Sequence, residues 1–348
     1  MRRTLLFVSI ASLGVGVVLG CEGDDTILAP LDAGDDATAS DVTTTPFDAS
    51  VPDTSTEPVL DASDGSTVDR GPTVIPFSGD PAGLFWEYGT NGGLYVADQA
   101  NSKIIKWTDA AGFGISWTLP APQNSGSTLG QVVRALDGTM FVPRAGTGAD
   151  NTVLWITNLG DAGDLALMPD ASLDPSFTRS GFTLLPDNTT IDTRFADSDS
   201  GNVGTVDTLK SPPSESKLVS GLSKPLAVVY NESRLYIADQ DLNVVIAIAQ
   251  TGGSFVSDAG DGGGDGGGHG RVFVAIDQPN FACAGADGDL YVTSLNGSVY
   301  RVSSAGVATT IATGLHELRG VAFDGATHRI FVAEHGASVN QIRIYPID

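Results

Sequence analysis

One short motif, Leu94-Tyr95-Val96-Ala97-Asp98, decides the fold because it recurs along most of the chain. Close copies are Leu235-Tyr236-Ile237-Ala238-Asp239 and Ile330-Phe331-Val332-Ala333-Glu334. Looser copies are Met140-Phe141-Val142-Pro143-Arg144, Thr190-Ile191-Asp192-Thr193-Arg194 and Leu290-Tyr291-Val292-Thr293-Ser294. The second residue of the motif returns every 40 to 55 residues. Internal similarity at such a period indicates a repeat architecture.

Each copy lies among further segments that are typical of strands. An apolar run and a turn precede it, as in Gly320–Gly325, and a third apolar strand follows, as in Lys103–Trp107. A fourth strand comes after most copies, as in Ile115–Leu119, and no helical periodicity interrupts the pattern. Four strands per repeat are typical of a propeller blade. The six copies therefore predict an all-β fold, a six-bladed β-propeller over residues 73–348, rather than a β-sandwich.

The last repeat lacks its fourth strand, because the sequence has only three residues after Tyr345. An unassigned strand-like segment, Thr73–Phe77, precedes the first repeat. We expect this N-terminal segment to complete blade six, since a blade shared by the two ends of the domain closes the ring and leaves no open sheet edge.

The motif with the following Asn101 and the strand Lys103–Ile105 resembles the NHL repeat. The wider pattern is similar to the six-bladed superfamily of SMP-30/gluconolactonase-like and strictosidine-synthase-like propellers. That resemblance implies that the motif's Asp braces a turn between strands. It also implies, for an enzyme of the lactonase type, a divalent metal in the central channel. Such enzymes carry a Glu-Gly-Pro-x-Trp-like segment, whereas Gly83–Tyr88 holds Trp and Glu in another order.

The residues at the predicted starts of the inner strands do not form a recognisable metal site. They are Ala82, Gly130, Arg179, Lys224, Asn280 and Arg319. Only Asn280 offers an oxygen ligand, and three cations repel a metal ion. We therefore assign no catalytic residues, leave the metal site unknown, and interpret the protein as a ligand- or protein-binding module. A metal-dependent hydrolase with a channel metal is the alternative.

The positions of the rare cations suggest where a ligand binds. Arg179, Lys224 and Arg319 lie at inner-strand starts, and Arg144 and Arg194 lie at second-strand ends. Both kinds of position lie at the same rim of a propeller, so these five side chains are predicted to surround one channel mouth and to bind a small anionic ligand. The alternative is that they only neutralise the carboxylates of the neighbouring motif ends.

The N-terminus has the features of an export signal. Arg2 and Arg3 precede the short apolar stretch Leu5–Leu19, which is too short for a comfortable membrane span. The sequence Val18-Leu19-Gly20-Cys21 resembles the bacterial lipobox, which implies that residues 1–20 are a signal peptide and that Cys21 is lipidated. We expect an exported protein anchored to the bacterial cell envelope at the outer membrane or periplasmic face. An ordinary signal peptide followed by a chance cysteine is the alternative.

Residues 21–72 differ sharply in composition from the rest of the chain. After Cys21 they are rich in Asp, Thr, Ala, Ser and Pro and contain Arg70 as their one base. Such a segment buries too little apolar surface to fold, so we expect an acidic, disordered linker. The whole chain has a net charge of −24 and a pI near 4.2, which argues against a nucleic-acid partner. The expected partners are a membrane, through the anchor, and an unidentified protein or small ligand, with the chain itself a monomer.

Two loops have features of calcium sites, and two side chains, His335 and Cys283, are candidates for acid–base or thiol chemistry. Asp258–Gly270 is a Gly/Asp-rich run and Asp197–Asn202 carries two carboxylates, but neither has a complete ligand set, so no cofactor is predicted and calcium is kept as the alternative. His335 follows Glu334 at a mouth-facing position, and a surface histidine is the simpler interpretation. Cys283 lies in an apolar inner strand and is expected to be inert.

Overall fold

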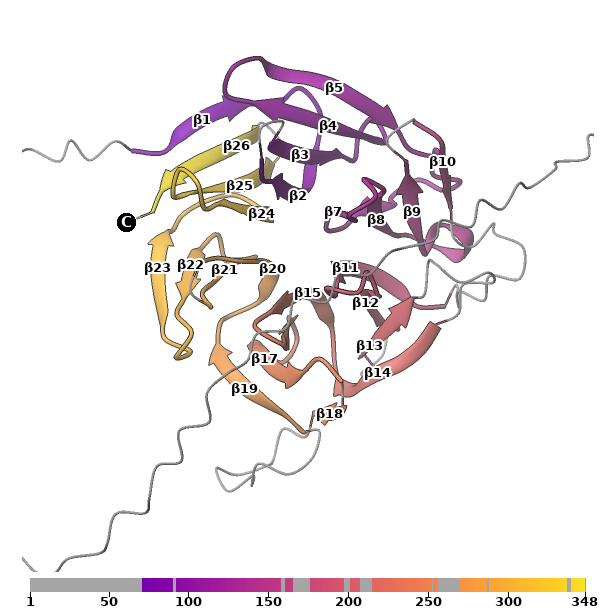
Figure 1. Cartoon of the computed structure of the whole chain (residues 1–348), viewed down its shortest axis with the longest axis vertical. Coiled ribbons are helices and arrows are strands. Elements are labelled where there is room, and N and C mark those ends of the chain that lie inside the picture. The colour runs from indigo at the N-terminus through magenta and orange to yellow at the C-terminus, as the bar shows by residue number, and fades with distance from the viewer. Residues whose placement is uncertain are drawn as a thin grey trace, which may run out of the picture. The chain divides into compact units, whose positions relative to one another are not determined.

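The computed structural model describes residues 71–89, 92–157, 160–164, 176–196, 201–206, 215–251, 253–255, 269–286, 288–336 and 339–347. All of them belong to one compact unit that begins at Ser66. Its strands surround a central axis and form a β-propeller, which confirms the predicted all-β fold (Figure 1). The described part of the chain contains one helical turn, the 3-10 helix η1 (Gly148–Asp150), and none of its helices is long and apolar enough to span a membrane.

Four of the five sheets follow the predicted order of strands from the axis outward (Figure 1). The first contains β2 (Pro81–Glu87), β3 (Gly93–Asp98), β4 (Lys103–Thr108) and β5 (Gly112–Thr118). The next contains β6 (Thr128–Leu129), β7 (Val133–Arg134), β8 (Met140–Ala145), β9 (Thr152–Ile156) and β10 (Ala162–Asp164). Another contains β20 (Pro279–Ala284), β21 (Leu290–Ser294), β22 (Val299–Val302) and β23 (Ala308–Ala312). The last contains β24 (Leu318–Asp324), β25 (Arg329–Gly336), β26 (Val339–Pro346) and β1 (Thr73–Pro76).

The remaining sheet has nine strands, so the described residues form five sheets where the sequence predicted a six-bladed propeller. It holds β11 (Thr178–Leu184), β12 (Thr190–Phe195), β13 (Gly201–Val206), β14 (Glu215–Leu222), β15 (Pro225–Asn231), β16 (Arg234–Asp239), β17 (Val244–Ala249), β18 (Gly253–Phe255) and β19 (His269–Ala275). The cause is β18, which pairs in parallel with β14 on one side and with β19 on the other. This short strand comes from the insertion between β17 and β19, and it joins two neighbouring repeats into one sheet.

The predicted closure by the N-terminal strand is confirmed. Strand β1 pairs antiparallel with β26, with Thr73 opposite Ile344 and Pro76 opposite Gln341. Phe77, which follows β1, is buried, and its ring centroid lies 5.2 Å from that of Phe113 on β5. The N-terminal segment therefore contributes both ladder hydrogen bonds and an apolar side chain to the propeller.

Two N-terminal deletions test this closure. Removing residues 22–70 leaves β1 in place and is expected to leave the free energy of unfolding unchanged. Removing residues 22–78 deletes β1 and the buried Phe77 and is expected to cost about 3 kcal/mol or more, the scale of losing a buried phenylalanine. Urea denaturation of the two proteins measures the difference, and equal midpoints would contradict a structural role for β1.

Every complete inner strand is irregular at the same place. The pairing register shifts between Pro81 and Leu84, and at the corresponding positions of β11, β15, β20 and β24. In the second sheet the same place is a full interruption between β6 and β7. A β-bulge bends its strand and turns a side chain in a new direction. The repeated bulge therefore turns one or two residues from each inner strand away from the regular ladder, near one end of the central channel.

Candidate functional site: the mouth of the central channel

The bulged residues line a cavity of about 230 Å³ at one end of the inner strands. Its apolar wall consists of Leu129, Ala145, Phe195, Leu226 and Phe281. Its polar groups come from Thr128, Thr178, Ser180, Asn280 and Arg319. These residues come from strands of all but the first sheet, so a small molecule bound there contacts segments far apart in the sequence. Among the described residues of the lining, Arg319 is the only charged one.

Arg319 is held at this cavity by two neighbours. Its Nη1 donates a hydrogen bond to Gln99 Oε1 at 3.0 Å and lies 3.5 Å from Asp80 Oδ1. Gln99 Oε1 also accepts the Leu129 backbone N–H at 3.3 Å, so this amide ties the rim of the first sheet to the next one. The Arg319 side chain is 20% exposed, which places its charge in a partly desolvated position.

His335 is a further neighbour of Asp80. Its Nδ1 lies 2.8 Å from Asp80 Oδ1 and 3.0 Å from Asn340 Oδ1. Both atoms are acceptors, so Nδ1 carries the hydrogen. The other ring nitrogen lies 3.7 Å from Glu317 Oε2. Asp80 Oδ1 therefore lies near both the His335 ring and the Arg319 guanidinium, and His335 is not among the described residues that line the cavity.

Of the five predicted cations, only Arg319 is among the described residues that line the cavity. Arg144 is buried; its Nη2 donates to the Pro120 carbonyl, and its Nη1 lies 3.9 Å from Asp150 Oδ1. Lys224 is half-buried, and its backbone N–H donates to Asp239 Oδ1 at 3.0 Å. Both residues thus hold loops at the rim.

Arg179 and Arg194 form a directly opposed pair on β11 and β12. Arg179 is fully buried, with its Nε 3.3 Å from Asp192 Oδ2 and its Nη1 donating to the carbonyls of Asn151 and Phe177, each at 3.0 Å. The Arg194 guanidinium lies 5.2 Å from the centre of the Phe177 ring. These cations are built into the wall between the second sheet and β11–β14.

The carboxylates at the motif ends brace turns, as the resemblance to NHL repeats implied. Asp98 accepts the backbone N–H groups of Asp80 and Asn101. Asp239 accepts those of Ser223, Lys224 and Leu242, and burial raises its pKa in spite of these donors. Arg144 is the last residue of its motif copy, as Asp98 is, but it acts as a donor where the carboxylates act as acceptors. Its guanidinium donates to the Pro120 carbonyl in the preceding loop.

Glu334 is the corresponding residue on β25. Burial by itself would raise its pKa, but hydrogen bonds from Arg343, His316 and Gln341 hold the pKa below its usual range. This carboxylate is therefore ionised and fully engaged in bracing the rim. It does not supply a free acid or base at the cavity.

The cavity does not suit a divalent metal. None of the lining residues that the structure describes is a carboxylate, and the one charged group among them is the cation Arg319. Within the described ranges, no three His, Cys, Asp or Glu side chains lie close enough to hold a metal ion. Hard divalent cations require several oxygen ligands, so the channel metal of a lactonase-type site does not fit these residues. The two loops considered for calcium lie outside the described residues, apart from the backbone of Gly201–Asn202 and of His269–Gly270.

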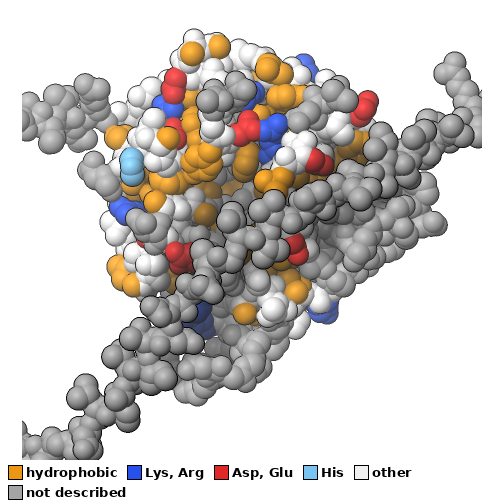
Figure 2. Space-filling model, in the orientation of Figure 1, with side chains coloured by type: hydrophobic (Ala, Val, Ile, Leu, Met, Phe, Trp, Pro, Cys, Tyr) orange, Lys and Arg blue, Asp and Glu red, His pale blue; other side chains and the backbone are white. Residues whose placement is uncertain are grey.

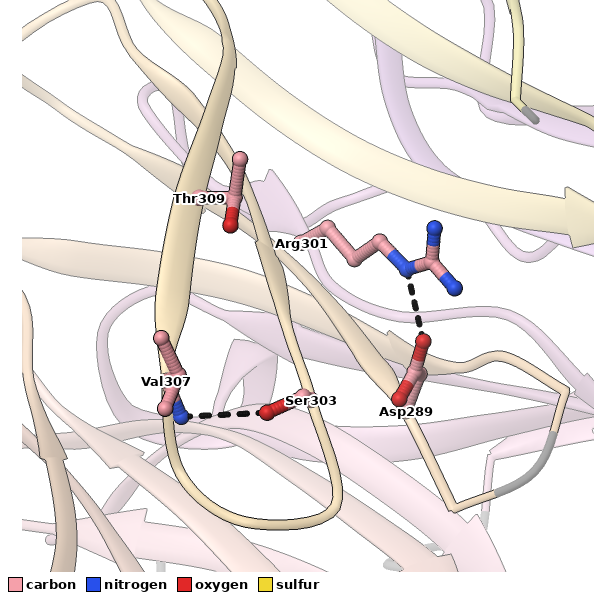
Figure 3. A pocket seen from close by; sticks show the side chains of 5 residues that line it. All are labelled: Asp289, Arg301, Ser303, Val307 and Thr309. Carbon is pink, nitrogen blue, oxygen red and sulfur yellow. Dashed lines mark hydrogen bonds and ion pairs between the residues drawn. The ribbon is translucent and has the colours of Figure 1, made fainter.

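A second hollow, of about 270 Å³, lies away from the channel on β22 and β23 (Figure 3). Arg301 Nε donates to Asp289 Oδ2 at 2.6 Å, and the Val307 N–H donates to Ser303 Oγ at 3.2 Å. These polar groups satisfy one another, so they have a structural explanation. Figure 2 shows acidic and basic side chains scattered singly over the described part of one face, without a patch of one sign.

Cys283 lies on β20 and packs beside the aromatic cluster around Tyr291. Burial raises the pKa of its thiol above the usual range. A thiolate is the reactive form of cysteine, so this geometry agrees with an inert side chain.

The sequence did not indicate most of the cavity. Phe195, Thr178, Ser180 and Gln99 were missed, because hydrophobic alternation predicts which face of a regular strand is buried and says nothing of a bulge. The recurring small residue near each inner-strand start was the available signal. Gly83, Gly130, Gly181 and Gly320 all lie at the bulge, where a neighbouring inner strand approaches closely.

No protein-family model and no curated relative matches this sequence. In structure, the chain is similar to a gluconolactonase from Xanthomonas campestris, with 13% identity over 80% of this chain and 95% of that one and a TM-score of 0.58. It is similar to the calcium-binding protein regucalcin from Agrobacterium tumefaciens, with 15% identity, coverage of 79% and 95%, and a TM-score of 0.57. A histidine-to-alanine, catalytically inactive virginiamycin B lyase from Staphylococcus aureus, solved with quinupristin, matches at 15% identity, coverage of 78% and 98%, and a TM-score of 0.53. The described part of this chain thus has the β-propeller fold of the gluconolactonase-like proteins and virginiamycin B lyase.

Proposed function

We propose that the protein is a binding module whose channel mouth takes a small anionic ligand with an apolar body. The observation that supports this is the cation Arg319 in a cavity whose other described lining groups are neutral. A low-dielectric cavity focuses the field of such a charge, so it attracts an anion even in a protein of net charge −24. The aromatic and aliphatic wall provides the surface that an apolar body needs.

A carboxylate is the anion that suits Arg319 best. Within the described part of the chain, the hydrogen bond and the ion pair of Arg319 engage only Nη1, which leaves the other guanidinium donors for a ligand. A guanidinium binds a carboxylate through two parallel hydrogen bonds. We propose that Arg144, Arg179, Arg194 and Lys224 support this site through their positive field rather than by contact.

Replacing Arg319 by Ala tests the site. With 3-phenylpropanoate as probe, the dissociation constant measured by calorimetry is expected to rise at least about tenfold, because a charge-assisted hydrogen bond is lost. Arg271→Ala, an exposed arginine on β19, is the matched control and is expected to leave the dissociation constant unchanged. Equal binding by both variants would contradict a role for Arg319.

We further propose that the nine-stranded sheet counts as two blades, β11–β14 and β15–β19, which makes six in all. An apolar cluster lies at each of the six junctions that this division defines, for example between Ile191 and Ile237. Each of the six groups of strands also has its own bulged or interrupted inner strand, which supports the count.

A metal-dependent hydrolase is the alternative function, and the likeness to a gluconolactonase favours it at the level of the fold. The lining of the channel mouth argues against it, because an arginine takes the place of oxygen ligands. The two functions differ in a simple measurement: a channel metal would make the melting temperature sensitive to EDTA, whereas the binding module is expected to show no change.

We also propose that the protein is exported and held at the bacterial cell envelope by a lipid on Cys21, with residues 22–72 as a spacer. Two acyl chains on one residue suffice for stable membrane attachment. In a bacterial host, Cys21→Ser is expected to move the protein from the membrane fraction to the soluble fraction and to remove the acyl mass. Membrane retention of this variant would overturn the lipid anchor.

A further inference from the structure

One amide side chain in the lining of the cavity has a fixed orientation. Asn280, on β20, lines the cavity beside Phe281, and its Nδ2 donates to the Leu318 carbonyl of β24 at 2.7 Å. Strands β20 and β24 lie side by side around the channel (Figure 1), so this hydrogen bond links two neighbouring inner strands. A carbonyl oxygen only accepts hydrogen bonds, so the NH₂ group of the amide faces Leu318 and Oδ1 is directed away from it.

The other end of this amide is an acceptor that a ligand can reach. Within the described part of the chain, the side-chain hydrogen bond of Asn280 is made by Nδ2, and no described residue donates to Oδ1. This oxygen is also not one of the described atoms that are both buried and without a partner, so it keeps accessible surface. Asn280 is 7% exposed as a whole and lines the cavity, so a ligand in the cavity is placed to meet this surface.

A ligand that fills the cavity displaces water from this acceptor. If the ligand offers no donor in return, Oδ1 is left without a hydrogen bond, which costs free energy and disfavours that ligand. We infer that Asn280 Oδ1 is a specificity-determining group of the cavity and accepts a hydrogen bond from the ligand. This inference rests on the proposed function, because it assigns the chemistry of the ligand at that site.

The anion-binding group and the acceptor lie on different parts of the wall. Arg319 belongs to β24, but its guanidinium extends to Gln99 and Asp80 at the rim of the first sheet. Asn280 lies on β20, the neighbour of β24 on the opposite side from the first sheet (Figure 1). The ligand is therefore a small acid with an apolar body that carries a neutral donor, such as a hydroxyl, apart from its carboxylate. A hydroxyphenyl acid has these three parts.

The test compares 3-phenylpropanoate with its 2-, 3- and 4-hydroxyphenyl analogues by calorimetry on the full chain. One of the three hydroxylated acids is expected to bind about tenfold more tightly than 3-phenylpropanoate, the scale of satisfying an acceptor that the ligand otherwise leaves unpaired. In Asn280→Leu this ratio is expected to fall to about one, while 3-phenylpropanoate still binds. Asn296→Leu is the matched control and should keep the tenfold ratio, because Asn296 is exposed in the turn between β21 and β22 and is not among the described lining residues.

A further probe makes the test independent of any variant. The methyl ether of the tightest hydroxylated acid has no donor, so it is expected to bind wild-type protein no better than 3-phenylpropanoate does. If the ether keeps the tenfold gain, if Asn280→Leu keeps it, or if all the acids bind equally, the role of Asn280 is overturned while the binding site itself stands. If none of the acids binds, the proposed function is overturned and the inference with it.

Discussion

Replacing Arg179 by Met or Asp192 by Val is expected to lower the free energy of unfolding by about 3–5 kcal/mol, whereas the double variant loses much less. Both side chains are fully buried, and each single change leaves the other charge in the interior without its partner. The double change removes both charges and leaves two apolar side chains in their place.

Valine is chosen to replace Asp192 because other repeats of the propeller carry an aliphatic residue at the same motif position. Asp192 occupies the motif position that is Val96, Ile237 or Val332 in other repeats, all of them fully buried. An aliphatic side chain therefore fits this position on the second strand of a repeat. Arg179 also donates to the carbonyls of Asn151 and Phe177, so the double variant loses two hydrogen bonds and is not expected to match a perfect apolar core.

Urea denaturation followed by tryptophan fluorescence measures the three variants against wild-type protein. The double-mutant cycle is expected to give a coupling energy of about 2 kcal/mol or more between the two residues. Additive losses would show that the Arg179–Asp192 ion pair does not stabilise the packing of β11 with β12.

The second large effect is expected from Gly130→Ala, which should cost about 3 kcal/mol or prevent folding. A Cβ at this position would overlap the Ser180 carbonyl oxygen and contact Pro143. Both neighbours are fixed, since Ser180 O accepts the Gln131 N–H at 3.0 Å and Pro143 O accepts the Gly130 N–H at 2.8 Å. A backbone atom that is held by hydrogen bonds cannot move aside, and overpacking of this kind is destabilising.

Gly114→Ala is the matched control, because a Cβ on this β5 residue would meet nothing within 4 Å. This change is expected to be neutral or to stabilise the protein by less than about 1 kcal/mol, through the reduced freedom of the unfolded chain. Thermal and urea denaturation of the two variants give the comparison. Similar stabilities would mean that the inner strands can separate at the channel at little cost.

Much of the architecture was predictable from sequence, because it depends on local periodicity. The motif ending in Asp98 is buried along its whole length in its copies, and its recurrence at a fixed period indicates strands in repeated sheets. The pairing of β1 with the C-terminal strands also followed from the position of each segment within the repeat, and the bracing role of Asp98 was implied by the resemblance to NHL repeats. These features depend on neighbours in sequence or on the regularity of the ring.

What the tertiary structure decided involves residues that are far apart along the chain. The joining of two repeats through β18, the hydrogen bond from Arg179 to the Asn151 carbonyl, and the reach of Gln131 to Ala282 are contacts between different repeats. A sequence pattern shows which face of a strand is apolar, but it does not show which bulged side chain meets which when the ring closes. The rim cations illustrate this: the sequence placed all five at one end of the strands, and only ring closure brought Arg319 into the cavity while it buried Arg144 and Arg179 in its wall.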